Sequence, residues 1–245
     1  MGTLDFIGET CARAAGMVFH PRRFRLGDSL LAFQRSAYDG LAVVSGVGFL
    51  LGVILAFQCA VALKMFGVEI YVSDMLAIAL FRELGPVVTA IILAGRTGSA
   101  FAAEIGTMKA NEELNALTTM GLPPIRFLVL PRVVAAILAM PILTICAELA
   151  GLIGGSLVLQ MMNVPTVVFW HHVMSTASLF MIVFGLLKSC LFGLLVGLIG
   201  CGAGMRTQMT ADGVGVSATS AVVGGIVAIA VADGILAVLC YLWNL

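Results

Sequence analysis

Charged residues are unusually scarce in this sequence. Asp, Glu, Lys and Arg make up only 11% of its 245 residues, whereas 61% are hydrophobic and the mean hydropathy is +1.12. Ordinary soluble domains carry roughly 25% charged residues. The 13 basic and 13 acidic residues cancel, so the chain lacks the basic field with which proteins attract nucleic acids. This composition excludes a soluble domain and a nucleic-acid partner, and it predicts an integral membrane protein.

Motifs for catalysis and nucleotide binding are also missing. The segment Gly185–Ser189 ends in Lys-Ser like a phosphate-binding loop, but Leu187 stands where that loop requires glycine. There is no G-x-S-x-G or H-E-x-x-H motif, and no stretch between the apolar segments is long enough for a catalytic domain. The six cysteines lack C-x-x-C spacing and are interpreted as small buried hydrophobes. We therefore expect no catalytic residues, no cofactor and no metal site in this chain, and any energy must come from a partner.

The first 36 residues are too polar to cross a membrane. Asp5 and Glu9 interrupt the apolar positions before His20, so this segment does not resemble a cleavable signal peptide. Residues 3–19 show helical apolar spacing, and a basic cluster follows at 20–25. Because anionic headgroups attract arginine, we predict an amphipathic elbow over 1–36 at the cytoplasmic interface. A solvated helix without a special role is the alternative.

Five apolar segments follow, each long enough for a helix to cross about 30 Å of hydrocarbon. They cover residues 40–63, 75–95, 133–157, 178–201 and 219–243. Gly48 and Gly52 in the first form a small-xxx-small pair suited to close helix packing. Lys64, Glu69 and Asp74 mark a short exposed turn after it. The predicted fold is therefore an all-α integral membrane protein, with the N-terminal elbow followed by a five-span domain over 37–245.

Several ionisable residues lie inside these spans, where charge is costly and marks either function or a structural ion pair. They are Arg82, Glu83, Glu148, Lys188 and Asp233. Gly85 and Pro86 follow Glu83, and because proline removes a backbone hydrogen bond, a kink or local opening is expected there. Lys188 is expected to pair with Glu83 or Asp233. A structural pairing and a role in transport both stay open.

A polar segment separates the second span from the third, and it predicts a short cytoplasmic helix over about 104–120. Asn111 is the expected N-cap, with acidic residues in the first turn, and Gly121 is expected to end the helix. Two leucines spaced i, i+3 form its apolar side. A helix held at both ends in this way is one that a motor subunit could push. Its candidate contact residues are Glu104, Glu112, Glu113, Leu114 and Leu117.

Basic residues outside the spans gather on one side. Five lie in the elbow, four in the loop after the second span and one after the fourth, whereas Lys64 alone lies opposite. The positive-inside rule then places the N-terminus in the cytoplasm and the C-terminus outside. Segment 166–177 is placed at the outer interface; its His171 and His172 point about 100° apart on a helix, which makes a poor metal site.

Four motifs in the sequence closely resemble those of one family, the MlaE-like permeases of Mla/Mce lipid-transport ABC systems. They are RELGPVV at 82–88, AGRTGSA at 94–100, AEIGTM at 103–108 and the dipeptide Pro131-Arg132. The regions around Lys188-Ser189 and 224–233 are similar too, so the resemblance covers nearly the whole chain.

This resemblance implies a permease homodimer in the bacterial inner membrane, with phospholipid or a related lipid as substrate. It implies two cytoplasmic ABC ATPase subunits, which would bind the ATP and Mg, and a periplasmic MCE-domain partner. Segment 104–120 would be the coupling helix, and Arg82, Glu83, Lys188 and Asp233 match charged residues within the family's spans. A lipid pocket is implied at the dimer interface, around spans one, two and five. Its expected wall in span one consists of Leu51, Leu55, Phe57 and Val61.

Two other classes of function stay open from the sequence. An ion-coupled secondary transporter would use Glu83, Glu148, Lys188 and Asp233 as a relay, although five spans without a detectable inverted repeat argue against it. A structural anchor of an envelope complex would need neither charge within the membrane nor a coupling helix.

Overall fold

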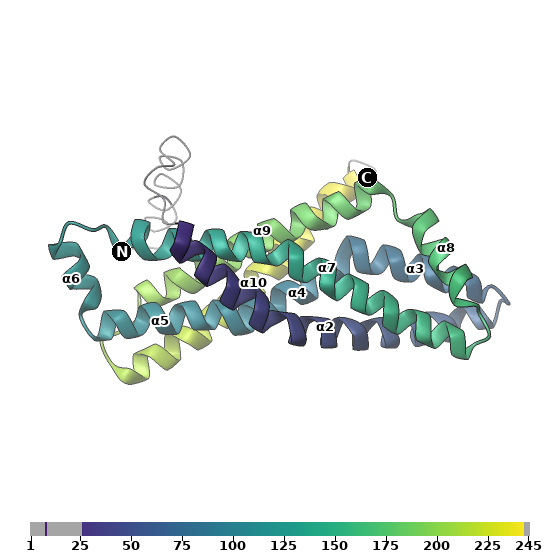
Figure 1. Ribbon diagram of the computed structural model, residues 1–245, viewed down its shortest axis with the longest axis horizontal. Helices are drawn as coiled ribbons and strands as arrows, with labels where there is room; N and C mark the ends of the chain where they lie inside the picture. Colours follow the sequence, from purple (N-terminus) through teal and green to yellow (C-terminus); the bar gives the residue numbers. More distant parts are fainter. Residues whose placement is uncertain (1–7, 9–25, 243–245) are drawn as a thin grey trace. The chain divides into compact units, whose positions relative to one another are not determined.

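The computed structural model of the chain describes Gly8 and residues 26–242 (Figure 1). All elements from residue 26 onward are helical, and this part of the chain contains no strand. They are α2 (Leu26–Lys64), η2 (Glu69–Tyr71), α3 (Val72–Ala79), η3 (Leu80–Leu84), α4 (Gly85–Leu93), η4 (Ala94–Gly98), α5 (Ser99–Ala110), α6 (Glu113–Thr119), η5 (Ile125–Val129), α7 (Leu130–Met161), α8 (Thr166–Thr176), α9 (Leu179–Met205) and α10 (Ala211–Leu242). Of the short elements, η2 is a 3-10 turn, and η3, η4 and η5 are π-helical turns.

The predicted elbow over 1–36 lies, apart from Gly8, outside the described residues as far as position 25. From Leu26 onward the chain is already helical and continues through α2 to Lys64. The expected boundary between elbow and first span is therefore not a break in the helix. Residues 26–64 contain no proline, so nothing in them interrupts the backbone hydrogen bonds.

Five helical segments of the described chain are long and apolar enough to cross a membrane, which confirms the all-α, five-span fold. They run over Ala32–Lys64, Glu69–Ala110, Ile125–Met161, Leu179–Met205 and Asp212–Leu242. Most extend beyond the apolar runs that predicted them. A helix continues past the hydrocarbon boundary wherever the flanking residues can still form backbone hydrogen bonds, so hydropathy alone marks the span and not the helix ends.

The second span departs furthest from its prediction. Its helical segment has 42 residues, about 60 Å at 1.5 Å per residue, which is twice the thickness of the hydrocarbon core. The sequence suggested a span ending at Gly95 and a separate helix from Glu104. Instead α5 continues the span through η4, because residues 99–110 are rich in alanine and lack proline.

The chain divides into two compact units. Unit one takes in the described parts of Met1–Ser36, Ala90–Ala139 and Leu191–Leu245, and unit two takes in Ala37–Thr89 and Met140–Cys190. Helices α2, α4, α7 and α9 contribute residues to both units.

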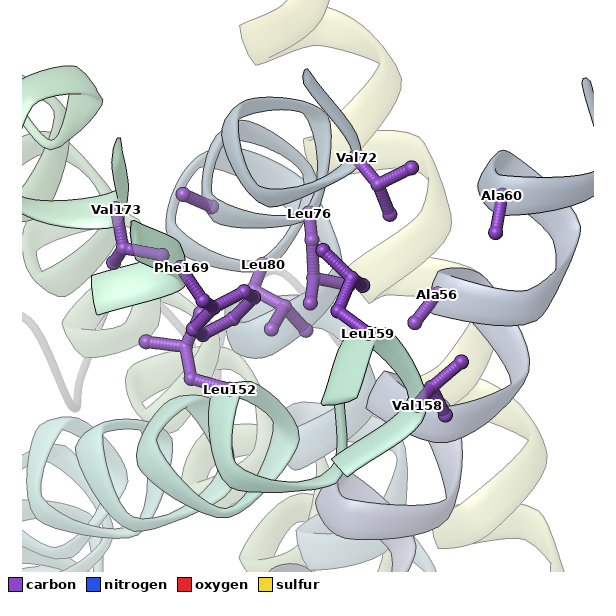
Figure 2. Close-up of a cluster of buried hydrophobic side chains, with 11 residues drawn as sticks. Ala56, Ala60, Val72, Leu76, Leu80, Leu152, Val158, Leu159, Phe169 and Val173 are labelled. Carbon is purple, nitrogen blue, oxygen red and sulfur yellow. The ribbon is translucent and has the colours of Figure 1, made fainter. Parts of the chain in front are cut away.

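Unit two is built around one apolar cluster. Figure 2 shows Phe169, from α8, beside Leu80 and Leu152, from η3 and α7. Its buried members are Ala56, Ala60, Val72, Leu76, Ala77, Leu80, Leu152, Val158, Leu159, Phe169 and Val173. The cluster therefore joins the short helix α8 to three of the long helical segments.

Glycines allow α2 and α7 to approach closely within unit two. A Cβ atom added to Gly48 would lie 2.5 Å from the carbonyl oxygen of Ala147, and one added to Gly52 would overlap the backbone of Gly151. The small-xxx-small pair in the first span thus lies at a helix crossing, as predicted.

Unit one packs α5 against both α9 and α10. Its apolar cluster consists of Phe101, Ile105, Ile125, Val129, Val133, Ala136 and Cys201. A Cβ atom on Gly204 of α9 would lie 2.8 Å from the Cβ of Ile105, so these two helices are in close contact. Along its other side α5 runs beside α10, where Gly106 faces Ser217.

Candidate functional site

Glu83 lies in the π-helical turn η3, near the middle of the second apolar run. The turn is wide enough that the backbone N–H of Gly85 donates to the carbonyl of Leu80, five residues earlier. Pro86, the next residue, has no backbone N–H to donate. The irregular backbone predicted beside Arg82 and Glu83 is therefore confirmed.

Lys188 on α9 is the partner of Glu83. Its ammonium group donates a hydrogen bond to the Oε2 atom of Glu83, which confirms one of the two predicted pairings. The Lys188 side chain is only 1% exposed, whereas the Glu83 side chain is 38% exposed. The pair therefore places a cation in the interior of unit two and leaves one side of the carboxylate accessible.

Glu148 of α7 lies next to the same turn, a proximity that the sequence did not predict. A Cβ atom on Gly85 would lie 2.7 Å from the Cγ and 2.8 Å from the Oε1 atom of Glu148. Glu148 itself is 3% exposed. The absent side chain at position 85 thus lets a buried carboxyl group reach the backbone of η3. A polar residue in span three was visible in the sequence, but nothing there indicated which turn it would meet.

The other two predicted charges lie in different units. Arg82 is half-buried in η3 of unit two, beside Glu83. Asp233 is half-buried on α10, which belongs to unit one. The alternative pairing of Lys188 with Asp233 stays a prediction.

The helix between the second and third spans is α6. It ends at Thr119, and Gly121 stops it as predicted: this glycine has a φ of 73° and donates its N–H to the carbonyl of Thr118 at 3.0 Å. The N–H of Leu122 donates to the carbonyl of Leu117, also at 3.0 Å. These two bonds close the last turn with the glycine in the left-handed conformation that it tolerates best.

The start of α6 differs from its prediction. Asn111 is not the N-cap but ends α5, and Glu112, with a left-handed φ of 60°, precedes α6 without a side-chain capping bond. The Asn111 amide instead donates to Glu113 Oε1 at 3.4 Å. Because α5 extends the second span to Ala110, Asn111 falls at the end of one helix before the next begins. The single helix expected over 104–120 is therefore two.

The residues predicted to contact a partner are unequally accessible on α6. Glu112 and Glu113 are exposed, Leu117 is half-buried, and Leu114 is only 7% exposed. Leu114 packs within this chain, and its contact with a partner stays a prediction. Met120, at the opposite end of α6 from the two acidic residues, is 65% exposed.

Glu104 belongs to α5, where it fixes the end of the second span to the start of α7. Arg132 donates to its carboxylate from Nη2 at 2.9 Å and from Nε at 3.3 Å. On the same helix Lys109 donates from Nζ to the carbonyl of Met205, the last residue of α9, at 2.9 Å. The helix that leads into α6 is thus tied to two others in unit one.

The four residues proposed as a lipid-facing wall do not share one face of α2. Leu51 and Leu55 pack against the unit two cluster, whereas Phe57 and Val61 are 47% and 69% exposed. The exposed apolar stripe of this helix comprises Val43, Val47, Leu50, Ile54, Phe57 and Val61. Its i, i+4, i+7 spacing follows the helical repeat. Contact of this stripe with lipid stays a prediction.

Asp74 lies in the first turn of α3 and not in an exposed turn, which corrects its prediction. Thr176 of α8 donates to its Oδ1 atom at 2.7 Å, and the Nδ1 atom of His172 lies 3.3 Å from both carboxylate oxygens. The His171 and His172 rings are 6.3 Å apart and inclined by 71°. Among residues that the structure describes, no group of three His, Cys, Asp or Glu side chains could hold a metal ion.

Residues 30–239 match the family model described as Permease MlaE. A probable ABC transporter permease protein of Rickettsia typhi is 36% identical over 80% of this chain and 76% of its own length. The intermembrane phospholipid transport system permease protein MlaE of Haemophilus influenzae is 36% identical over 76% of this chain and 72% of its own. The chloroplastic protein TRIGALACTOSYLDIACYLGLYCEROL 1 of Arabidopsis thaliana is 35% identical over 85% of this chain and 60% of its own.

Five spans, an ion pair that joins the second span to the fourth, and a short helix between the second and third spans are typical of a multi-pass membrane transport protein. The chain belongs to the MlaE permease family. It is an ABC transporter permease and therefore a transport subunit, not an enzyme.

Proposed function

We propose that this permease moves phospholipid or a related lipid between the bacterial inner membrane and a periplasmic MCE-type partner. A separate ABC ATPase, which binds the ATP and Mg, supplies the energy. The observation that carries the proposal is the similarity to the Haemophilus protein, whose name is that of an intermembrane phospholipid transport permease and which is 36% identical over 76% of this chain.

The charged turn in the second span supports a lipid substrate. A phospholipid headgroup needs a polar environment if it is to pass through the apolar layer. A structural anchor moves no headgroup and does not need a polar group inside the membrane. The half-exposed Glu83 carboxylate, held by Lys188, offers such an environment. The apolar stripe on α2, with Phe57 and Val61, offers a surface for acyl chains.

The helix α6 is our candidate for contact with the ATPase. Its acidic residues and Met120 are exposed, and its last turn is closed by Gly121. Exposed acids at one end of a helix and an exposed apolar side chain at the other form a surface that a groove in a partner can bind. One uninterrupted helical segment, Glu69–Ala110, connects the charged turn to the loop before α6, and movement of α6 would reach that turn along it.

A second copy of the chain is the proposed partner within the membrane. The span formed by α10 is the least buried of the five described spans. Val223, Val227, Val231 and Ile235 repeat every four residues and are each more than half exposed. Such a continuous apolar face suits a homodimer. The basic residues of the loops favour a cytoplasmic N-terminus and a periplasmic C-terminus.

Copurification with the ATPase tests this function against its rivals. An ABC permease should bring down the ATPase from membranes, and phospholipid should stimulate ATP hydrolysis by the complex. A secondary transporter would copurify with no ATPase and would respond to an ion gradient. If the chain is only a structural anchor that binds the ATPase, lipid should leave the rate of ATP hydrolysis unchanged.

A further inference from the structure

A cavity of about 560 Å³ lies between the end of α9 and the start of α10, wholly within unit one. Its volume is in the range of sites that bind small molecules or parts of larger ones. Its walls combine apolar side chains with charges of both signs.

The lining changes from apolar to polar along both helices. On α9 it runs from Leu198 and Ile199 inside the span to Arg206 just beyond the last turn. On α10 it runs the opposite way, from Asp212 in the first turn to Gly224 inside the span. Both charged residues are exposed, so they mark the mouth of the cavity, and the apolar residues mark its depth. An amphiphile would meet matching surroundings at each end.

The two charged residues at the mouth favour a headgroup that carries both a negative and a positive charge. A guanidinium group binds phosphate oxygens through paired hydrogen bonds, and a carboxylate attracts an ammonium group. Arg206 and Asp212 together therefore match a headgroup with one phosphate and one amine. We propose that this cavity binds the headgroup and upper acyl chain of a zwitterionic phospholipid, at a site separate from the stripe on α2. This proposal rests on the proposed function, lipid transport, and adds a binding site and a headgroup class to it.

The cavity also adjoins the helix that leads into α6. A Cβ atom on Gly106 of α5 would lie 2.8 Å from Oγ1 of Thr207 and 3.4 Å from Oγ of Ser217, and both of those residues line the cavity. Lys109 donates to the carbonyl of Met205, the neighbour of Arg206. A lipid bound here would contact helices that are hydrogen-bonded to or packed against α5. Its binding would therefore affect α5 and the following helix α6, where the ATPase is proposed to bind.

The test uses the full chain, purified and placed in phosphatidylglycerol nanodiscs without any ATPase. A trace of photoactivatable phosphatidylethanolamine, or of phosphatidylglycerol with the same reactive acyl chain, is crosslinked and mapped by mass spectrometry. The variants are Arg206→Gln, Asp212→Asn and Ala203→Phe, the last filling the cavity. Arg126→Gln is the matched control, because it removes the same charge from a residue that does not line the cavity.

Phosphatidylethanolamine should label residues 198–224 several-fold more than phosphatidylglycerol does. Arg206→Gln should lower labelling by both lipids, Asp212→Asn should lower it for phosphatidylethanolamine alone, and Arg126→Gln should leave it unchanged. Ala203→Phe should abolish it; if that variant does not fold, the two charge variants decide. Equal labelling by both lipids, or equal effects of Arg206→Gln and Arg126→Gln, would overturn the proposal. Because no ATPase is present, lost lipid transport with intact labelling would count against the proposed function alone.

Discussion

Lys188 donates its hydrogen bond to Glu83 at the one turn of the second span where the helix widens to a π turn and is followed by proline. The cation is buried and the carboxylate is half accessible. A charge held in a low-dielectric interior without a partner costs several kcal/mol, so the pair both holds α9 to the second span and keeps a polar group inside the membrane. Stability and transport are therefore expected to depend on the same two residues.

Exchanging the two paired charges tests whether the fold depends on their having opposite signs. Lys188→Glu should place two carboxylates together and reduce accumulation in the membrane strongly, since breaking a buried pair typically costs about 3–5 kcal/mol. Lys188→Glu combined with Glu83→Lys should recover much of the loss, because opposite signs face each other again. Membrane abundance and the melting temperature in detergent measure both effects. If the double variant is no better than the single one, the pair does not stabilise the fold in this way.

Gly85 should tolerate no side chain. Gly85→Ala would place a Cβ atom 2.6 Å from the carbonyl oxygen of Leu80 and 2.7 Å from Cγ of Glu148. Overpacking of this kind costs about 1–3 kcal/mol, so the melting temperature should fall. Gly95→Ala is the control, since its Cβ atom would meet nothing within 4 Å. Equal melting temperatures for the two variants would contradict the close approach of Glu148 to η3.

Asp74 should hold α8 in place. It accepts a hydrogen bond from Thr176 and lies beside His172. Hydrogen bonds to a charged group contribute about 1.5–3 kcal/mol each, so Asp74→Ala should speed amide hydrogen exchange over residues 166–176 by roughly tenfold or more. His171→Ala changes a neighbouring ring without touching Asp74 and serves as the control. Unchanged protection of α8 in Asp74→Ala would show that the apolar cluster alone holds this helix.

The accessible face of α6 should determine ATPase binding. Reversing Glu112 and Glu113 to Lys, or changing Met120 to Asp, should reduce copurification of the ATPase, with the Met120 change the more severe because apolar anchors dominate interfaces. Leu114→Asp is not informative, since that side chain is buried and the variant would fail through folding. Glu69→Lys, at the start of the helical segment that leads towards α6, is the control. Normal ATPase recovery from both α6 variants would rule out this contact surface.

The sequence predicted the spans and the charged turn well because their causes are local. An apolar run of more than 20 residues has few alternatives to a membrane helix, and proline behind a charged pair disturbs any helix that contains it. Gly121 ended α6 as expected for the same reason, since a glycine after a helix readily takes the left-handed conformation.

The misplaced features depend on packing between distant segments. Asn111 was assigned to the wrong helix because nothing in its own neighbourhood shows that α5 continues the second span. Leu114 has the same hydrophobicity whether it faces this chain or a partner, and only the folded chain distinguishes the two. The approach of Glu148 to Gly85 joins residues 63 positions apart, beyond the reach of any local pattern.

Transfer of labelled phospholipid by the reconstituted complex tests the proposed function most directly. Proteoliposomes holding the chain with its ATPase are mixed with the soluble MCE-type partner, and lipid on that partner is measured with and without Mg-ATP. Transfer should require both this chain and ATP hydrolysis, and it should fall strongly in Glu83→Gln while the ATPase stays bound. Lipid transfer that proceeds at the same rate without ATP, or without this chain, would contradict the proposed function.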